Sequence, residues 1–329
     1  MKFSETGLNK ELLKSVNSLG FEVPTPIQEQ VIPYLLNEKR DLVALAQTGT
    51  GKTASFGLPI LQKIEIKNIQ PQAIILSPTR ELCIQITKDI KSYATYLKKI
   101  NITAVYGGAS IQTQIKSLKL GSQIVVGTPG RVIDLIKRKV LKLKSIKYVV
   151  LDEADEMLNM GFKEDLDTIL SSTPSAKQSL LFSATMPKEV LRISKNYMST
   201  PNKIEVAKRN QGADNVEHFY YMVNARDKYQ ALRRICDVNI NIYGIIFCRT
   251  RRETQKIADL LMADHYSAEA LHGEISQTQR THAMERFKKG KTQLLVATDV
   301  AARGLHVDLS LIHISEPTRL LSISYAVFC

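Results

Sequence analysis

A glycine-rich segment between an apolar run and a helical pattern is the first stretch whose residue types could do chemistry. The apolar run 42–45 leads into Ala46-Gln47-Thr48-Gly49-Thr50-Gly51-Lys52-Thr53. In such a loop, backbone N–H groups surround phosphate oxygens and the following helix presents its positive end to them. The Lys would reach the β- and γ-phosphates, and the Thr hydroxyl would ligate Mg²⁺. The pattern predicts a nucleoside-triphosphate site made by Gln47, Thr48, Gly49, Thr50, Gly51, Lys52 and Thr53.

Two details qualify this loop. Ala46 stands where the first glycine of the pattern is usual. The alternative, a glycine-rich turn with a chance Lys-Thr, is disfavoured by the strand in front of it. Pro59 lies in the helix that should follow, and we expect a kink or an early end there because proline lacks a backbone N–H.

An acidic pair follows a second apolar strand pattern, 148–151. Asp152 could hold Mg²⁺ opposite Thr53, while Glu153 could orient and deprotonate an attacking water. Acidic residues after strands are also common helix N-caps. Alone, Asp152 would more often be a cap, but together with the phosphate loop the pair predicts catalysis by Lys52, Asp152 and Glu153.

The composition favours a polyanionic partner. The 329 residues include 45 Lys and Arg against 32 Asp and Glu, a net charge of +13. Such a balance indicates nucleic acid before a membrane, although a merely soluble basic protein has the same composition. Four scattered Cys without a C-x-x-C pair indicate neither zinc nor disulfides. Without a signal peptide or a membrane-length apolar run, we predict a cytoplasmic protein with no membrane partner.

Short apolar runs alternate with longer amphipathic stretches from residue 42 onward, which predicts α/β architecture with parallel sheets. The pattern stops in the polar, Gly-containing segment near 206–216 and then resumes, so we expect two similar α/β units in tandem. The predicted strands lie at 42–45, 73–76, 102–105, 124–126, 148–151, 180–182, 218–222, 245–247, 269–271 and 294–297. Helical patterns include 80–97 and 131–137.

Taken in order, these motifs resemble the DEAD-box ATP-dependent RNA helicases, whose name is spelled by Asp152-Glu153-Ala154-Asp155. The resemblance covers about residues 3–308 and is greatest to bacterial cold-shock-type members. It implies two tandem RecA-like domains with parallel sheets, the second incomplete. The implied boundaries are 1–206 for the first domain, 207–216 for a linker, 217–308 for a partial second domain and 309–329 for an atypical tail.

The resemblance implies an ATP site that extends beyond the phosphate loop. The segment 21–28 is similar to the family's adenine-reading segment, and Phe3 to an aromatic upstream of it. The amide of Gln28 can pair with N6 and N7 of adenine, on which Phe21 would stack. An ordinary surface glutamine is the alternative, which the preceding Pro-Thr-Pro disfavours. The further implied ATP-binding residues are Phe21, Thr25, Gln28, Asp299 and Arg303.

RNA contacts are implied in both domains. Arg and Thr side chains and glycine N–H groups bind backbone phosphates without reading sequence. The implied residues are Pro78, Thr79, Arg80, Gly107, Gly108, Thr128, Pro129, Gly130 and Arg131 in the first domain, and Arg249, Thr250, His272, Gly273, Arg280 and Thr298 in the second. Each piece alone would be a loop or a cap, so the interpretation rests on their joint occurrence. Ser183, Ala184 and Thr185 resemble the motif that couples nucleotide state to strand opening.

The sequence departs from the family pattern near its end. His306 stands where an acidic residue near the ATP ribose is usual, and no arginine-finger segment follows Asp308. From 309 to 329 only Glu316 and Arg319 are formally charged. We interpret this tail as a frameshift, chimaeric join or assembly artefact. We therefore expect the second core to lack its closing strands and to expose a sheet edge.

The predicted function is RNA-stimulated ATP hydrolysis with Mg²⁺, coupled to local separation of short RNA duplexes or to remodelling of RNA–protein complexes. The resemblance implies that ATP and single-stranded RNA bind in the cleft between the two domains. It also implies ribosome-assembly or RNA-decay proteins as partners. The alternative is a clamp that binds ATP and RNA with weak catalysis, because arginine fingers contribute about 10³ to 10⁵ in turnover.

Overall fold

The structure, a computed structural model, describes residues 1–47, 49–97, 99–206, 219–239, 241–298, 301, 312–315 and 324–328. The chain divides into two compact units, Met1–Arg209 and Asn210–Cys329. The first unit is here called unit 1 and the second unit 2. The predicted linker 207–216 lies outside the described residues.

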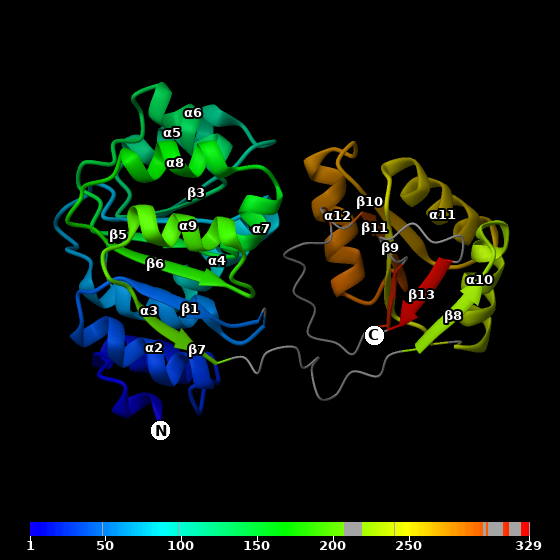
Figure 1. Cartoon of the computed structure of the whole chain (residues 1–329), viewed down its shortest axis with the longest axis horizontal. Coiled ribbons are helices and arrows are strands. Elements are labelled where there is room, and N and C mark those ends of the chain that lie inside the picture. Colours follow the sequence, from blue (N-terminus) through cyan, green and yellow to red (C-terminus); the bar gives the residue numbers. More distant parts are fainter. Residues whose placement is uncertain are drawn as a thin grey trace. The chain divides into compact units, whose positions relative to one another are not determined.

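Unit 1 is a parallel sheet with helices on both faces (Figure 1). Its strands are β1 (Leu42–Leu45), β2 (Ala73–Leu76), β3 (Ile102–Val105), β4 (Ile124–Gly127), β5 (Tyr148–Leu151), β6 (Gln178–Ser183) and β7 (Asn202–Glu205). Its helices are η1 (Phe3–Glu5), α1 (Lys10–Ser18), α2 (Pro26–Asn37), α3 (Lys52–Lys63), α4 (Arg80–Tyr93), α5 (Ile111–Lys119), α6 (Pro129–Lys137), α7 (Ala154–Asn159), α8 (Lys163–Ser171) and α9 (Lys188–Tyr197).

The described strands of this sheet follow the order β3-β4-β2-β5-β6-β1-β7, and every pair is parallel. Successive strand residues enter opposite cores, since side chains alternate between the two faces of a sheet. Leu42 and Ala44 pack with residues of α1 to α4, whereas Val43 and Leu45 pack with residues of α6 to α9. Both faces are therefore covered, as the continuous apolar runs predict.

The predicted strands of unit 1 are confirmed, and β7 was missed because its residues Asn202–Glu205 are mostly polar and only Ile204 is buried. The expectation that Pro59 ends its helix early is wrong, because α3 continues to Lys63. Phe56, Leu58 and Ile60 on either side of the proline are buried. Their packing keeps the segment helical despite the missing N–H.

The amino end of this sheet is tied together by buried polar side chains. Asp41 accepts hydrogen bonds from the backbone N–H groups of Ser179 and Ser199, both at 2.6 Å, and so joins the segment before β1 to the start of β6 and to the segment before β7. The amide of Gln178 donates to the carbonyl of Arg40 at 2.7 Å. These bonds hold loops that are far apart in sequence in one arrangement.

Unit 2 contains β8 (Phe219–Val223), η2 (Ala225–Asp227), α10 (Lys228–Val238), β9 (Gly244–Cys248), α11 (Arg251–Ala263), β10 (Ala268–Leu271), α12 (Gln277–Lys288), β11 (Leu294–Thr298), β12 (Ile312–Ser315) and β13 (Ser324–Phe328). The described strands follow the order β10-β11-β9-β12-β13-β8. β10, β11 and β9 are parallel, as the strand–helix alternation predicts.

The expectation that unit 2 lacks its closing strands is wrong, because two strands from 309–329 join its sheet. β12 pairs with β9 in parallel, and β13 pairs antiparallel with both β12 and β8. The tail has neither an amphipathic helical face nor a family motif, but a strand needs only extended backbone with free hydrogen-bonding groups. The interpretation of 309–329 as sequence from another source stays a prediction, which sequencing of the source locus tests.

The Asp41 bridge should support unit 1 more than a surface ion pair does. Replacing Asp41 by Ala leaves two backbone N–H groups without acceptors, and we expect the free energy of unfolding to fall by about 2–4 kcal/mol. As a control, Asp134→Ala removes an exposed pair with Arg138 and should change it by less than about 0.5 kcal/mol. Urea denaturation of the full chain measures both, and equal effects of the two changes would contradict the bridge.

Candidate active site

The residues predicted to do chemistry in unit 1 follow the carboxyl ends of its parallel strands. Ligands of open parallel sheets bind at that edge. The phosphate loop follows β1, the acidic pair follows β5, and Ser183 ends β6, which lies between β1 and β5. The segments predicted to contact RNA follow β2, β4 and β3, on the other side of β5. The strand order thus gives the edge a nucleotide half and an RNA half, which meet at β5.

Lys52 and Asp152 form a buried pair at the centre of the nucleotide half. The Nζ atom of Lys52 lies 3.9 Å from Oδ1 of Asp152 and 3.3 Å from the carbonyl oxygen of Ala46. Both side chains are buried. The ammonium therefore lies across the mouth of the loop, where it can meet a phosphate. Thr48 lies outside the described residues.

The phosphate loop requires glycine at two described positions. Gly49 has φ +77° and Gly51 has φ +87°, in the left-handed region that residues with a Cβ rarely adopt. A Cβ on Gly51 would lie 2.3 Å from the amide nitrogen of Gln28, whereas one on Gly49 would meet nothing within 4 Å. The backbone at Gly51 is therefore in close contact with the segment predicted to read adenine.

The segment 21–28, predicted to read adenine, is joined to the phosphate loop by two hydrogen bonds. The hydroxyl of Thr25 donates to the carbonyl of Thr50 at 2.7 Å, and the amide of Gln28 donates to the carbonyl of Gly51 at 3.1 Å. The amide oxygen of Gln28 accepts from the backbone N–H of Thr25 at 2.9 Å, in a capping box at the start of α2. Gln28 is thus a buried structural residue as well as the predicted adenine reader.

Phe21 lies between two other aromatic side chains. Its ring stacks on Phe3 with centroids 6.3 Å apart, and it meets the edge of Tyr93 at 6.3 Å. Phe3 is buried, while Phe21 is half-buried. The upstream aromatic identified in the sequence therefore supports Phe21, which is the ring left partly open to a ligand.

Burial sets the protonation of the acidic pair. Desolvation raises the pKa of the Asp152 carboxyl above its usual range, although Lys52 opposes the shift. Burial, followed by the charge of Asp152, raises the pKa of Glu153 to about 7. Glu153 also has φ +52°, a left-handed conformation that is unusual for a residue with a Cβ. A carboxyl with a pKa near neutrality suits proton transfer from water.

Asp155 connects the acidic segment to the end of β6. Its Oδ2 atom accepts hydrogen bonds from the backbone N–H of Thr185 at 2.9 Å and from the Thr185 hydroxyl at 2.7 Å. Its own N–H donates to the Ser183 hydroxyl at 3.3 Å. A movement of Asp152 and Glu153 can therefore be transmitted to 183–185 through a direct side-chain contact.

Arg80 covers the two glycines in the RNA half of the edge. A Cβ on Gly108 would lie 2.1 Å from a terminal nitrogen of Arg80, and one on Gly107 would lie 3.7 Å away. The guanidinium is therefore placed directly over the backbone of the loop after β3. A cation beside exposed glycine N–H groups is a suitable cradle for a phosphate.

Arg131 forms hydrogen bonds with the loop after β3, which Arg80 also covers. Its terminal nitrogens donate to the carbonyl of Ala109 at 3.3 Å, and one also donates to the side chain of Gln114 at 3.0 Å. Gln114 in turn donates to the carbonyl of Tyr106 at 3.0 Å. Sequence reasoning missed Gln114, because an isolated glutamine within a helical pattern carries no signal of a partner on another segment.

Two further residues predicted to contact RNA lie at the starts of helices. Thr79 is the N-cap of α4 and accepts from the N–H of Leu82, so part of its role is structural. Thr128 precedes α6, with Pro129 at the first helical position. Pro78 and Gly130 lie beside these two positions. The predicted RNA residues of unit 1 thus collect at helix N-termini, where N–H groups and the helix dipole favour anions.

Unit 2 repeats this arrangement over the adjacent strands β10, β11 and β9. Arg249 and Thr250 follow β9, and Thr250 caps α11 by accepting from the N–H of Glu253. Arg280 lies on α12, and Thr298 ends β11. The predicted residues Asp299 and Arg303, together with His306, lie outside the described residues.

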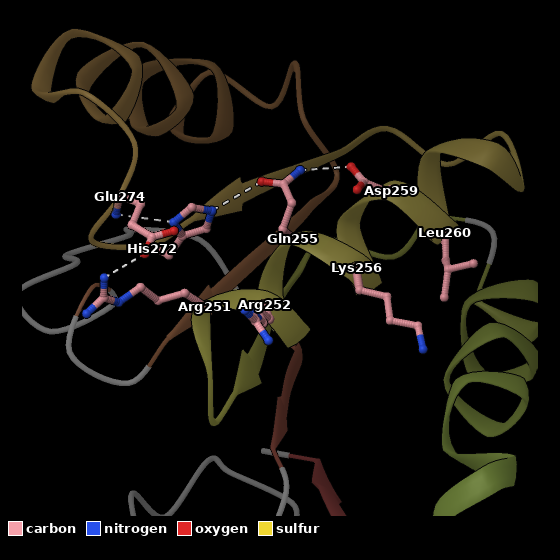
Figure 2. A pocket seen from close by; sticks show the side chains of 8 residues that line it. All are labelled: Arg251, Arg252, Gln255, Lys256, Asp259, Leu260, His272 and Glu274. Atoms are coloured by element: carbon pink, nitrogen blue, oxygen red, sulfur yellow. Dashed lines mark hydrogen bonds and ion pairs between the residues drawn. The ribbon is translucent and has the colours of Figure 1, made fainter.

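His272 lies beside a pocket of unit 2 that sequence reasoning did not identify (Figure 2). The ring is buried, and its Nδ1 atom accepts from the backbone N–H of Glu274 at 3.3 Å. The other nitrogen, Nε2, therefore carries the proton and donates to the Gln255 side chain at 3.1 Å. Gln255 donates onward to Asp259 at 2.8 Å. Both ring nitrogens of His272, a residue predicted to contact RNA, are thus engaged within the protein.

Within the described part of the chain, no group of three or more His, Cys, Asp or Glu side chains could hold a metal ion. Cys83, Cys236 and Cys248 are buried and unpaired by disulfides. None of the described helices is long and apolar enough to cross a membrane.

Comparison with known proteins identifies the two units. Residues 25–193 match the family described as DEAD/DEAH box helicase, and residues 227–325 match the helicase conserved C-terminal domain. This second match extends beyond Asp308. Two curated relatives are the ATP-dependent RNA helicase CshA of Listeria monocytogenes, 48% identical over 306 residues, and the DEAD-box ATP-dependent RNA helicase CshA of Geobacillus kaustophilus, 44% identical over 305 residues. Each alignment covers 93% of this chain but only 58% and 65% of the relatives, so the chain spans about three-fifths of their length.

Solved structures agree with this comparison. A DEAD box protein from Methanococcus jannaschii is 45% identical with a TM-score of 0.61, covering 96% of this chain and 85% of that one. Dbp5 of Saccharomyces cerevisiae, bound to RNA and ADP BeF3, is 32% identical with a TM-score of 0.84, covering 92% of this chain and 77% of that one. The predicted tandem RecA-like α/β fold is confirmed.

The close contact at Gly51 gives a matched pair of substitutions. Gly49→Ala should lower the free energy of unfolding by about 1 kcal/mol, the cost of a left-handed residue. Gly51→Ala should lower it by about 2–4 kcal/mol, because the Gln28 amide must also give up its hydrogen bonds. Denaturation without nucleotide measures both. The additional loss should disappear when Gln28→Ala is the background; an unchanged difference there would show that Gln28 is not the cause.

The pKa of Glu153 predicts a pH dependence of stability in the ligand-free protein. The folded-state pKa of about 7 exceeds the reference value of 4.5, so the folded state retains a proton that the unfolded chain loses. The resulting stabilisation is complete below pH 4.5 and is lost as the pH rises through about 7. The free energy of unfolding of the parent chain should therefore fall relative to that of Glu153→Gln as the pH rises across that interval. At the upper end of the interval the parent should be the less stable of the two proteins. Parallel stability curves for the two proteins would contradict this assignment.

Proposed function

Because the chain belongs to the DEAD/DEAH box helicase family, we propose that it is an RNA-stimulated ATPase that locally separates short RNA duplexes or remodels RNA–protein complexes. The observation that carries the proposal is the buried Lys52–Asp152 pair beside a Glu153 whose pKa lies near 7. Together these groups provide a cation for phosphate, an anchor for a metal ion and a base for water.

Each of these residues has a distinct part in the proposed reaction. Lys52 binds the β- and γ-phosphates together with the N–H groups of the loop, and Asp152 holds Mg²⁺ with the hydroxyl of Thr53. When bound, the metal ion neutralises charge on the phosphates. Glu153 orients the attacking water and accepts its proton, which the raised pKa of its carboxyl favours.

The segment 21–28 selects adenine in this proposal. Phe21 stacks on the base, and Gln28 uses the remaining hydrogen-bonding capacity of its amide on the adenine edge. Since Thr25 and Gln28 bond to the carbonyls of Thr50 and Gly51, binding of the base also positions the phosphate loop. Recognition of the base and of the phosphates is then one coupled event.

RNA binds through its sugar-phosphate backbone, so base identity has little effect. Arg80 and the glycines beneath it supply a phosphate contact, while Arg131 holds the loop after β3 in the shape that Arg80 needs. In unit 2, Arg249 and Gly273 contact RNA, and His272 positions Gly273 through its bonds to Gln255 and Glu274. The contact between Asp155 and Thr185 carries the state of the nucleotide toward the RNA half.

The physiological RNA and the protein partners also belong to the proposal, because the chain spans about three-fifths of its curated relatives. Assemblies that mature ribosomes or degrade RNA are the partners we propose. They present structured RNA, on which a helicase of low sequence specificity can act.

Phosphate release measured with and without single-stranded RNA tests the proposed activity. We expect RNA to stimulate release in the parent chain and Glu153→Gln to lower it by at least about 10²-fold, because the base is lost. Lys52→Ala should weaken ATP binding, while Lys10→Ala on the exposed start of α1 should not. A parent chain that binds ATP and RNA without any stimulated release would instead support the clamp, and unchanged ATP affinity in Lys52→Ala would overturn the nucleotide site.

A further inference from the structure

We propose that the edge of the unit 1 sheet opposite the active site is a second, sequence-independent RNA-binding surface. This edge, here called the basic edge, consists of the connections that lead from each helix into the next strand: 38–41, 64–72, 94–101, 120–123, 138–147, 172–177 and 198–201. The proposal rests on the proposed function only in taking RNA as the polyanion that this protein meets.

Positive charge is concentrated on the basic edge. Its described residues include ten Lys and Arg against three Asp and Glu. The connections at the opposite edge, which lead from each strand into the next helix, contain no Lys or Arg in their sequence; their charged residues are Asp152 and Glu153. Lys52, Arg80 and Arg131 lie at the starts of the helices on that opposite edge, so it also carries cations, but the excess of positive over negative residues is larger on the basic edge.

These cations face solvent and are mostly unneutralised. Lys39, Lys67, Lys99, Lys139, Lys142 and Lys144 are all exposed, and none forms an ion pair with a residue that the structure describes. Of the three acidic residues on this edge, Asp41 is buried and bonded to backbone N–H groups, and Glu65 pairs with Lys147. The positive charge is thus free to act on a partner.

The loops that carry these lysines are rigidly held. Gln72, which is fully buried, donates to the carbonyls of Glu65 and Asn68. Gln123, also buried, accepts from the N–H of Asn101 and donates to the carbonyl of Ile66, and so joins three connections. Together with the Asp41 and Gln178 bonds, these contacts fix the backbone of several connections from which the lysines extend, which lowers the entropic cost of binding.

Two of the lysines occupy backbone conformations that favour glycine. Lys99 has φ +64° and Lys139 has φ +57°. Lys139 directly follows the C-cap of α6, a position where glycine is the usual residue, whereas Lys99 lies further along the connection after α4. Strained positions of this kind persist where the side chain is needed, which links these two cations to a function rather than to folding.

Compensation of helix dipoles is provided by other cations. A cation in the last turn of a helix stabilises the negative end, and Lys63, Lys119 and Lys137 can serve in that way from within the helices that lead into this edge. The dipole effect falls off within the last turn. Lys142 and Lys144 lie several residues beyond the end of α6, so a different source of attraction is needed for them.

The dimensions and chemistry of this edge fit a nucleic-acid backbone. From the connection before β3 to the one before β1 there are five inter-strand spacings, or about 24 Å, along which cations are distributed. Nucleic acid presents phosphates at a comparable density along its axis. Lysines act as point charges on phosphate and do not read bases, so binding should be insensitive to sequence and sensitive to salt.

The decisive experiment compares two triple variants of the full chain with equal changes in net charge. The edge variant is Lys139→Gln, Lys142→Gln and Lys144→Gln; the control is Lys10→Gln, Lys88→Gln and Lys288→Gln, at exposed positions on three helices. Fluorescence anisotropy with a labelled RNA duplex bearing a single-stranded overhang, without nucleotide, gives the affinity between about 50 and 200 mM salt. We expect the edge variant to lower the log–log salt slope by about 2 to 3, and the control to leave it within about 0.5 of the parent.

Equal slopes for the edge and control variants would overturn the proposal. So would tight binding of the parent to vesicles of phosphatidylcholine and phosphatidylserine that the edge variant loses while its RNA binding is intact. The exposed Ile66, Ile69 and Leu120 on this edge would then be read as a membrane contact. Failure of the proposed function is distinct, since it appears as absent RNA-stimulated phosphate release whatever the salt slope.

Lys139→Gly separates binding from folding. It removes the charge and also relieves the left-handed strain, so we expect unchanged or higher thermal stability together with weaker RNA binding. A structural role for Lys139 predicts the opposite, namely lower stability with unchanged RNA affinity.

Discussion

Burial of carboxylates at the carboxyl edge of a parallel sheet is the constraint on which unit 1 depends. Asp152 is fully desolvated with a single cation, Lys52, at 3.9 Å. Removing charge from water is costly unless partners compensate it, so a site of this kind is incomplete until ligands supply more positive charge and more hydrogen bonds. The raised pKa values of Asp152 and Glu153 express that cost directly. The same unfavourable burial that lowers stability prepares the groups for phosphate chemistry.

The strand order brings the segments that carry these buried groups into contact with one another. β6 lies between β1 and β5, so the phosphate loop, the acidic segment and Ser183–Thr185 are neighbours although they are far apart along the chain. Asp155 joins two of these segments by side-chain hydrogen bonds, and Gln28 joins the loop to the segment in front of α2. Each contact is short and satisfied, so a shift in one segment must alter the others.

The two ends of the sheet differ in how they use polar groups. At the carboxyl end, the ring of Phe21 is only half-buried, and the guanidinium of Arg80 lies over the glycine loop after β3. At the amino end, the side chains of Asp41 and Gln123 form hydrogen bonds with backbone groups of neighbouring loops. The amino end of the sheet is therefore the more rigidly bonded of the two ends, and the basic edge lies at that end. Since helix C-termini also point to that end, part of its basicity is required by the fold and the remainder is available for function.

The sequence by itself determined the strands, the α/β class, the phosphate loop and the acidic pair, because apolar runs and glycine spacing act over a few neighbouring residues. Tertiary structure alone decided which partners these residues have. Gln28 bonds to the phosphate loop, both nitrogens of the His272 ring are used internally, and the tail forms strands beside β9. It also decided that lysines from many separate connections share one edge. These outcomes depend on a strand order that differs from the chain order, which no local pattern of residues encodes.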